Sequence, residues 1–178
     1  VRGTAAPELR LLTALEAARL MGVDLRSRVW RVAAASLPED LLWAAVADGV
    51  DAHMVRALWA NGAELAALVG RPLPLAQPLN YVGLFCGALD TILHGGQASG
   101  WWARCVALSE RDPARRECAG SAYLVPKSDR YSSTWELASA FAHALPVPRI
   151  DVLSATPSCR LLSPAQRALG SLALTALR

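Results

Sequence analysis

Three histidines and four cysteines are the side chains of this 178-residue chain that best suit nucleophilic chemistry. A thiol, an imidazole and a carboxylate can form a catalytic triad, and Asp90, His94 and Cys105 are the residues from which one can be drawn. Triad nucleophiles usually stand on a strained turn within a motif such as G-x-S-x-G, and the sequence contains none. We therefore predict no catalytic residue and expect that the protein is not an enzyme.

Metal binding is the second chemistry that cysteines offer. Cys86, Cys105, Cys118 and Cys159 are separated by gaps of 18, 12 and 40 residues, whereas zinc sites usually take two ligands from one tight C-x₂₋₄-C turn. Secreted disulfide scaffolds are shorter and richer in cysteine. The spacing favours buried reduced thiols and no metal, while one disulfide of unassigned pairing stays open.

Phosphate and dinucleotide cofactors leave glycine-rich signatures. Neither G-x-x-x-x-G-K-[ST] nor G-x-G-x-x-G occurs, and the single lysine, Lys127, follows a proline. We predict no cofactor. Gly95 and Gly96 follow an apolar segment and are expected to end its helix, with His94 in the last turn. A helix C-terminus exposes carbonyls, which do not stabilise an anion.

A helix-turn-helix is the alternative that the spacing allows. Ala45, Gly49 and Val55 match the small, turn and buried positions of that motif. Its second helix would present His53 and Arg56 to DNA. Major-groove readers carry several basic and amide side chains, but this segment is acidic, so a plain helical hairpin is preferred and nucleic acid is an unexpected partner.

Six tryptophans exceed the needs of a core of this size. Trp101 and Trp102 are adjacent, and neighbouring side chains on a helix diverge by about 100°. At least one of the pair should therefore lie at the surface, where tryptophan is typical of interface hot spots. We predict an interface at Trp101 and Trp102, with Arg104 on the same helix at its rim.

Helical signals outnumber strand signals. We expect a mainly α fold, a compact bundle of eight or nine short helices with at most one or two small strands, at 122–125 and 149–153. Residues 79–93 read as one buried helix, another helix begins at Trp101, and Asn61-Gly62 breaks a third. Capping boxes are expected at Ser36–Glu39 and Ser133–Glu136, and Asp51 should cap a helix.

Three prolines within residues 71–78 predict a connector between an N-terminal helical subdomain, 1–70, and a C-terminal one, 79–178. The two parts can also form one domain overall. The chain has no initiator Met and ends inside a helical pattern, which favours a piece of a longer chain.

Composition points to a GC-rich genome, because 17 Arg stand against one Lys and 34 Ala against two Ile. The net charge of +3 implies no polyanionic partner. No apolar run reaches the ~18–20 residues that span a bilayer, and no signal peptide is visible. We expect an intracellular or virion-associated location.

These observations predict a non-catalytic helical assembly domain whose partners are proteins, either itself or other subunits. A part of a capsid, tegument or scaffold protein from a GC-rich virus fits them. The alternative is a bacterial helix-turn-helix or ligand-responsive regulator, and an enzyme with a site of scattered residues stays open.

Overall fold

The computed structural model describes residues 10–70, 77–144, 146 and 149–156. Within them, four helices precede a unit in which strands and helices alternate. The elements in chain order are α1 Ala14–Leu20, α2 Arg28–Ser36, α3 Glu39–Ala47, α4 Ala52–Leu68, β1 Leu79–Leu84, α5 Thr91–Ala98, β2 Ala103–Ser109, α6 Pro113–Ala122, a 3₁₀ turn at Lys127–Asp129, β3 Arg130–Tyr131, α7 Thr134–His143 and β4 Val152–Ala155.

The strands form one parallel sheet in the order β3-β2-β1-β4. At the carboxyl edge, Leu84 of β1 pairs with both Ser109 of β2 and Ala155 of β4, and Tyr131 of β3 pairs with Ser109. The chain therefore steps outward from β1 to β2 to β3 and returns to the other side of β1. This is the order of the first four strands of a Rossmann-type doubly wound sheet.

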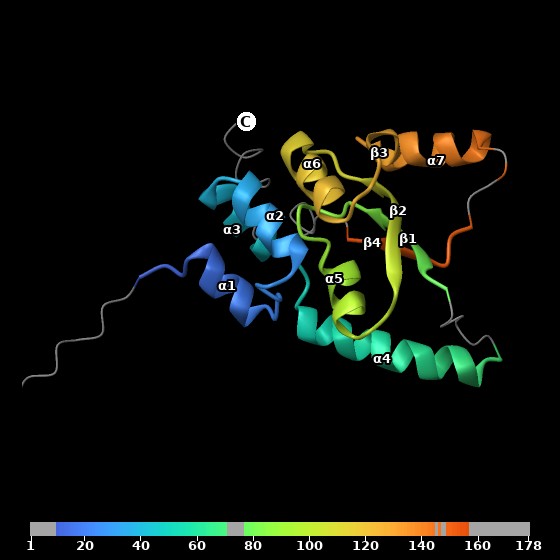
Figure 1. Cartoon of the computed structure of the whole chain (residues 1–178), viewed down its shortest axis with the longest axis horizontal. Helices are drawn as coiled ribbons and strands as arrows, with labels where there is room; N and C mark the ends of the chain where they lie inside the picture. The colour runs from blue at the N-terminus through green and yellow to red at the C-terminus, as the bar shows by residue number, and fades with distance from the viewer. Residues whose placement is uncertain (1–9, 71–76, 145, 147–148, 157–178) are drawn as a thin grey trace, which may run out of the picture.

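Helices cover both faces of the sheet (Figure 1). Tyr81 of β1 packs with Leu93 of α5 on one face, whereas Val82 and Ala107 pack with Leu137 of α7 on the other. Alternate residues of β1 thus enter two different apolar layers, as period-2 geometry requires. A strand buried on both faces carries an almost continuous apolar sequence.

The N-terminal helices pack against the part of the chain that carries the sheet, while the predicted division at 71–78 stays a prediction. Trp30 of α2 and Val46 of α3 belong to one apolar cluster that also contains Leu89, from the segment after β1, and Cys118 of α6. The N-terminal helices therefore share an apolar cluster with α6 and with the loop after β1. Residues 71–76 of the expected connector lie outside the described residues.

The expectation of a mainly α bundle is wrong, because the structure is α/β with a four-stranded parallel sheet and seven helices in its described part. The segment 79–93, read as one buried helix, is β1, a loop and the start of α5. Short apolar runs buried on every side look alike in a helix and a parallel strand, since neither alternates with polar residues.

Other local expectations fail for related reasons. Trp101 and Trp102 begin no helix but precede β2, residues 122–125 form no strand, and α4 continues through Asn61-Gly62. The capping box at Ser36 is also wrong, because Ser36 is the last residue of α2.

Local signals with a partner inside the same turn are confirmed. The side chain of Asp51 caps α4 by accepting from the N–H groups of His53 and Met54, and that of Ser133 caps α7 by accepting from the Glu136 N–H. The reciprocal bond of the expected capping box is not made, because the Glu136 side chain accepts from the Ser132 N–H. The strand expected at 149–153 is present as β4, Val152–Ala155, which begins three residues later and ends two residues later.

Candidate functional site at the carboxyl edge of the sheet

The candidate site lies where β1 and β4 end side by side. In open α/β sheets, ligands bind outside the carboxyl ends of the strands at the point where the strand order reverses. Here that point is between β1 and β4. Phe85, Glu110, Ser132 and Thr156 directly follow β1, β2, β3 and β4 in the order of the chain.

The loop after β1 has an unusual backbone. Phe85 has a φ of 56°, in the left-handed region that only glycine adopts freely, and its side chain is exposed. The Thr156 hydroxyl donates to the Phe85 carbonyl at 2.9 Å, and the Thr156 N–H donates to the Leu84 carbonyl at 3.1 Å. The strained residue is thus tied to β4, and strain of this kind is typical of ligand-binding loops.

Glu110 joins the loop to the end of β2. Its Oε2 accepts the N–H of Gly87 at 2.9 Å and its Oε1 accepts the N–H of Asp112 at 2.9 Å. A carboxylate oxygen accepts more than one hydrogen bond, so both oxygens of this half-buried group keep acceptor capacity. Next to it, the buried Ser109 hydroxyl has no hydrogen-bond partner among the described residues.

A buried carboxylate lies beneath the same loop. Asp90 caps α5 by accepting the Leu93 N–H at 3.1 Å, and the Tyr81 hydroxyl donates to both its oxygens, at 2.8 and 2.9 Å. That hydroxyl also contacts the Ser154 hydroxyl of β4. Gly83 makes room for the group, because a Cβ there would lie 2.6 Å from Asp90 Oδ2.

The charge of Asp90 is costly where it lies. Burial raises the pKa of Asp90 to about 6, although the hydrogen bonds from Leu93 and Tyr81 oppose the shift. Above that pH the group is an anion at the N-terminus of α5. Burial and the neighbouring Asp90 also raise the pKa of Cys86 well above its usual value.

The triad drawn from the sequence is not assembled. Asp90 pairs with Tyr81, while His94 accepts the Asp24 N–H on Nε2 at 3.1 Å and Cys105 donates to the Ala107 carbonyl. Burial lowers the pKa of His94. His94 therefore fastens the chain before α2 to α5, which is a structural role.

Gly95 and Gly96 do not end α5, which continues to Ala98. A Cβ at Gly95 would lie 2.5 Å from Val55 Cγ1, and one at Gly96 would lie 2.7 Å from the Trp59 ring. Both glycines are buried and let α4 approach α5 closely. The expectation that they form a helix end is wrong, since they serve packing.

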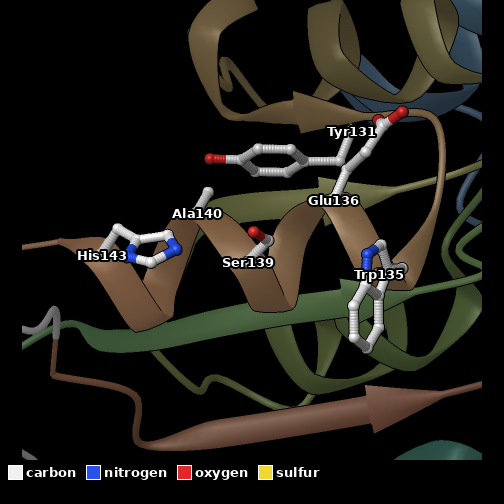
Figure 2. Close-up of a pocket in the computed structure, with 6 residues that line it drawn as sticks. All are labelled: Tyr131, Trp135, Glu136, Ser139, Ala140 and His143. Atoms are coloured by element: carbon white, nitrogen blue, oxygen red, sulfur yellow. The ribbon is translucent and has the colours of Figure 1, made fainter.

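A shallow depression of about 490 Å³ lies over α7 (Figure 2). Tyr131 lies on one side of the helix and Trp135 on the other in this view. The remaining lining residues are Glu136, Ser139, Ala140 and His143. The Ser132 hydroxyl and N–H both donate to Glu136, and these bonds lower the pKa of Glu136. With that carboxylate already bonded and no buried polar group in the lining, this surface is a weaker candidate than the strand ends.

The predicted interface residues lie at the opposite, amino edge of the sheet. Trp101 is buried against Trp59, with ring centroids 4.7 Å apart, whereas Trp102 is 65% exposed. Arg104 is exposed on β2, not on a helix, and its Nε donates to the Asn80 side chain at 2.8 Å. An interface role for these residues stays a prediction.

The two residues of the DNA-binding alternative lie at the start of α4. His53 is exposed, while Arg56 is half-buried and donates to the Gly22 carbonyl at 3.2 Å. The Arg56 guanidinium thus turns toward the body of the protein. Nothing further in the structure bears on DNA binding.

The described cysteines are reduced thiols. Cys86, Cys105 and Cys118 are free and buried, as predicted, and Cys159 lies outside the described residues. Among the described residues, no three His, Cys, Asp or Glu side chains are grouped so that they could hold a metal ion. No helix in that part of the chain has the length and apolarity needed to cross a membrane.

Sequence reasoning missed Glu110, Gly87 and Asp90 as a group. The signal was present: an acidic residue ends the second strand about 20 residues after a glycine-containing first turn. It becomes visible only when residues 79–84 and 103–109 are recognised as strands.

The fold is α/β with a four-stranded parallel sheet, and a polar cluster lies at the point where its strand order reverses. Comparison of the chain with protein-family models, with curated proteins and with solved structures finds no match.

Proposed function

We propose that the carboxyl edge of the sheet binds S-adenosylmethionine and that the protein belongs to the methyl-transfer enzymes. The observation that carries the proposal is Glu110 at the end of β2, bonded to Gly87 above a helix that a buried Asp90 caps. The Glu110 carboxylate favours a ribose, and the Asp90 carboxylate favours a cation over a phosphate.

Glu110 supports the ribose. In Rossmann-type sheets an acidic residue at the end of the second strand accepts hydrogen bonds from ribose hydroxyls. Glu110 lies 23 positions after Gly87 and is held in place by two backbone N–H groups. Its remaining acceptor capacity suits a vicinal diol, and the exposed Phe85 ring on the neighbouring strand end offers an apolar surface for a base.

Asp90 separates the two main classes of adenosine cofactor. A dinucleotide places its pyrophosphate on the N-terminus of the first helix of the sheet. In this chain the α5 N-terminus is occupied by the Asp90 carboxylate, and two anions in one low-dielectric place repel strongly. A sulfonium and an ammonium group, by contrast, gain from a buried negative charge.

S-adenosylmethionine carries adenosine and both of those cations. Bound, it supplies an electrophilic methyl group: the lone pair of a nucleophile bonds to the methyl carbon while the carbon–sulfur bond breaks, and S-adenosylhomocysteine leaves as a neutral thioether. In this site Glu110 would orient the ribose, while Asp90 would favour the cations through its field, since its own oxygens already accept from the Tyr81 hydroxyl and the Leu93 N–H.

Calorimetric titration of the chain with S-adenosylmethionine at pH 7.5 tests the assignment of Glu110. We expect the wild type to bind, and we expect the dissociation constant of Glu110→Ala to be at least tenfold larger. The reason is that a hydrogen bond to a charged group contributes about 1.5–3 kcal/mol. Glu64→Ala, a change at an exposed acid of α4, is the matched control and should leave affinity unchanged. Equal affinity in both variants would refute the ribose role of Glu110.

The assembly function predicted from the sequence remains a prediction, as does a viral origin. It rested on the excess of tryptophan, the missing catalytic signatures and the small net charge, and the parallel sheet corrects only the helical fold that accompanied it. The regulator alternative gains no observation from the structure.

A further inference from the structure

We propose that α4 is a self-association surface through which two copies of this chain pair in antiparallel fashion. Along its outer side, Met54, Leu58, Asn61, Leu65 and Leu68 follow one another at intervals of four, three, four and three residues. That spacing places all five on one stripe of the helix. The inner side of α4 is already used, since Val55 and Trp59 pack on α5.

The stripe is apolar and open. Met54, Leu58, Leu65 and Leu68 are 53%, 60%, 62% and 83% exposed. A contiguous row of this kind is unusual on a monomer and is typical of an interaction site.

The absence of charge on the stripe favours a second copy as its occupant. The acid and base of α4 lie off it: Glu64 borders the stripe, and Arg56 turns inward to the Gly22 carbonyl. A two-fold interface brings the same patch onto itself, so a charged stripe would repel its own copy whereas a neutral one does not.

The order of residues along the stripe is also self-complementary. In an antiparallel pair centred on Asn61, Met54 faces Leu68 of the second copy, and Leu58 lies within one residue of Leu65 of the second copy. Asn61 then meets Asn61 of the second copy, where two amides can bond to each other. The one polar residue of the stripe thus lies at its midpoint.

Gly62, beside that midpoint, supports a close crossing. A Cβ at Gly62 would meet nothing within 4 Å, so packing within one copy does not require glycine there. Glycine inside a helix costs about 0.5–1 kcal/mol relative to alanine. A partner helix that crosses at Gly62 would explain why this position has no side chain.

The size of the surface predicts a weak dimer. A 17-residue helix is ~25 Å long and ~10–12 Å wide, which is less area than the ~800 Å² per partner of a standard interface. We therefore expect a concentration-dependent monomer–dimer equilibrium. Because the contact is apolar, it should persist at high salt.

Sedimentation equilibrium of the chain over a wide concentration range, at low and high salt, is the first test. We expect a dimer that grows with concentration and is weakened at least tenfold by Leu58→Glu or Leu65→Glu. Leu20→Glu on α1, where the leucine is 66% exposed, is the control and should dimerise as the wild type does. A monomer at every concentration, or equal loss in the control, would overturn the proposal.

Cysteine cross-linking tests the register. Asn61→Cys should form a disulfide-linked dimer on mild oxidation, whereas Leu68→Cys alone should not, because its position faces Met54 of the second copy. A mixture of Met54→Cys and Leu68→Cys should cross-link. Efficient cross-linking of Leu68→Cys by itself would indicate parallel pairing and refute the antiparallel arrangement. This proposal is independent of the cofactor site.

Discussion

The N–H of Gly87 donates to Oε2 of Glu110 at 2.9 Å, which ties the turn after the first strand to the end of the second. The same carboxylate holds the Asp112 N–H, and Asp112 caps α6. One side chain therefore fixes the positions of two loops that line the carboxyl edge. Loss of the Glu110 side chain should therefore loosen both loops and also remove a hydrogen-bond acceptor from the site.

Asp90 should make the free energy of unfolding depend on pH. Its pKa is about 6 in the folded chain, against an ordinary value of 3.8, so the folded state binds the proton more tightly than the unfolded state. Stability from this group is therefore highest at low pH and falls as the pH rises from about 4 to about 6, by roughly 3 kcal/mol. The measurement is urea unfolding of the wild type and of Asp90→Asn at several pH values.

The difference in stability between the wild type and Asp90→Asn isolates the contribution of Asp90 to the pH dependence. Carboxylates with lowered pKa values, such as Glu117 and Asp151, contribute the opposite slope in both. The difference between wild type and Asp90→Asn should change in favour of the variant from pH 4 to pH 7 and be flat above that. A difference independent of pH would show that Asp90 is not a costly anion.

Ionisation of Asp90 should also control affinity for a cation. Since the carboxylate is charged above pH 6, binding of S-adenosylmethionine should strengthen from pH 5 to pH 7.5, and this gain should be smaller in Asp90→Asn. Calorimetric titration at the two pH values measures it. The prediction fails if the wild type binds equally well at both.

Gly83→Ala should damage the fold and the site together. The new Cβ would lie 2.6 Å from Asp90 Oδ2, and overpacking of this kind costs about 1–3 kcal/mol. Thermal and urea unfolding measure the loss. Gly62→Ala is the contrasting control: its Cβ meets nothing within one copy, so the monomer should gain up to about 1 kcal/mol from helix propensity.

The contact between α4 and α5 can be tested by a double-mutant cycle. Gly95→Ala would place a Cβ 2.5 Å from Val55 Cγ1 and should destabilise the chain by about 1–3 kcal/mol. Val55→Ala removes Cγ1, the nearer of the two obstructing atoms, and leaves the Cβ at 2.9 Å, so the two changes together should cost less than their sum. Strict additivity would mean that Gly95 does not pack against Val55.

A structural feature could be predicted from the sequence where the interacting residues lie close together along the chain. The caps at Asp51 and Ser133 were predicted because cap and N–H lie within one turn. The strand 79–84 could not be predicted, because both its faces are buried. Its apolar run has no polar alternation that would distinguish it from a helix. Gly95 and Gly96 misled because their partners, Val55 and Trp59, lie some 40 residues away.

The candidate site cannot be recognised in the sequence unless the strands are recognised first. Glu110 belongs to no motif in the sequence, and its role depends on its place directly after β2, next to β1. The sequence suggests Asp90 only as a triad member, because its partner Tyr81 lies nine residues earlier on a strand whose apolar run resembles a buried helix.

The central claim is that this site takes an adenosine bearing a cation and not a dinucleotide. Titrating the wild-type chain side by side with S-adenosylmethionine and with NAD at pH 7.5 tests it most directly. We expect S-adenosylmethionine to bind at least tenfold more tightly. Equal or tighter binding of NAD, or no binding of either at millimolar concentration, would contradict the claim.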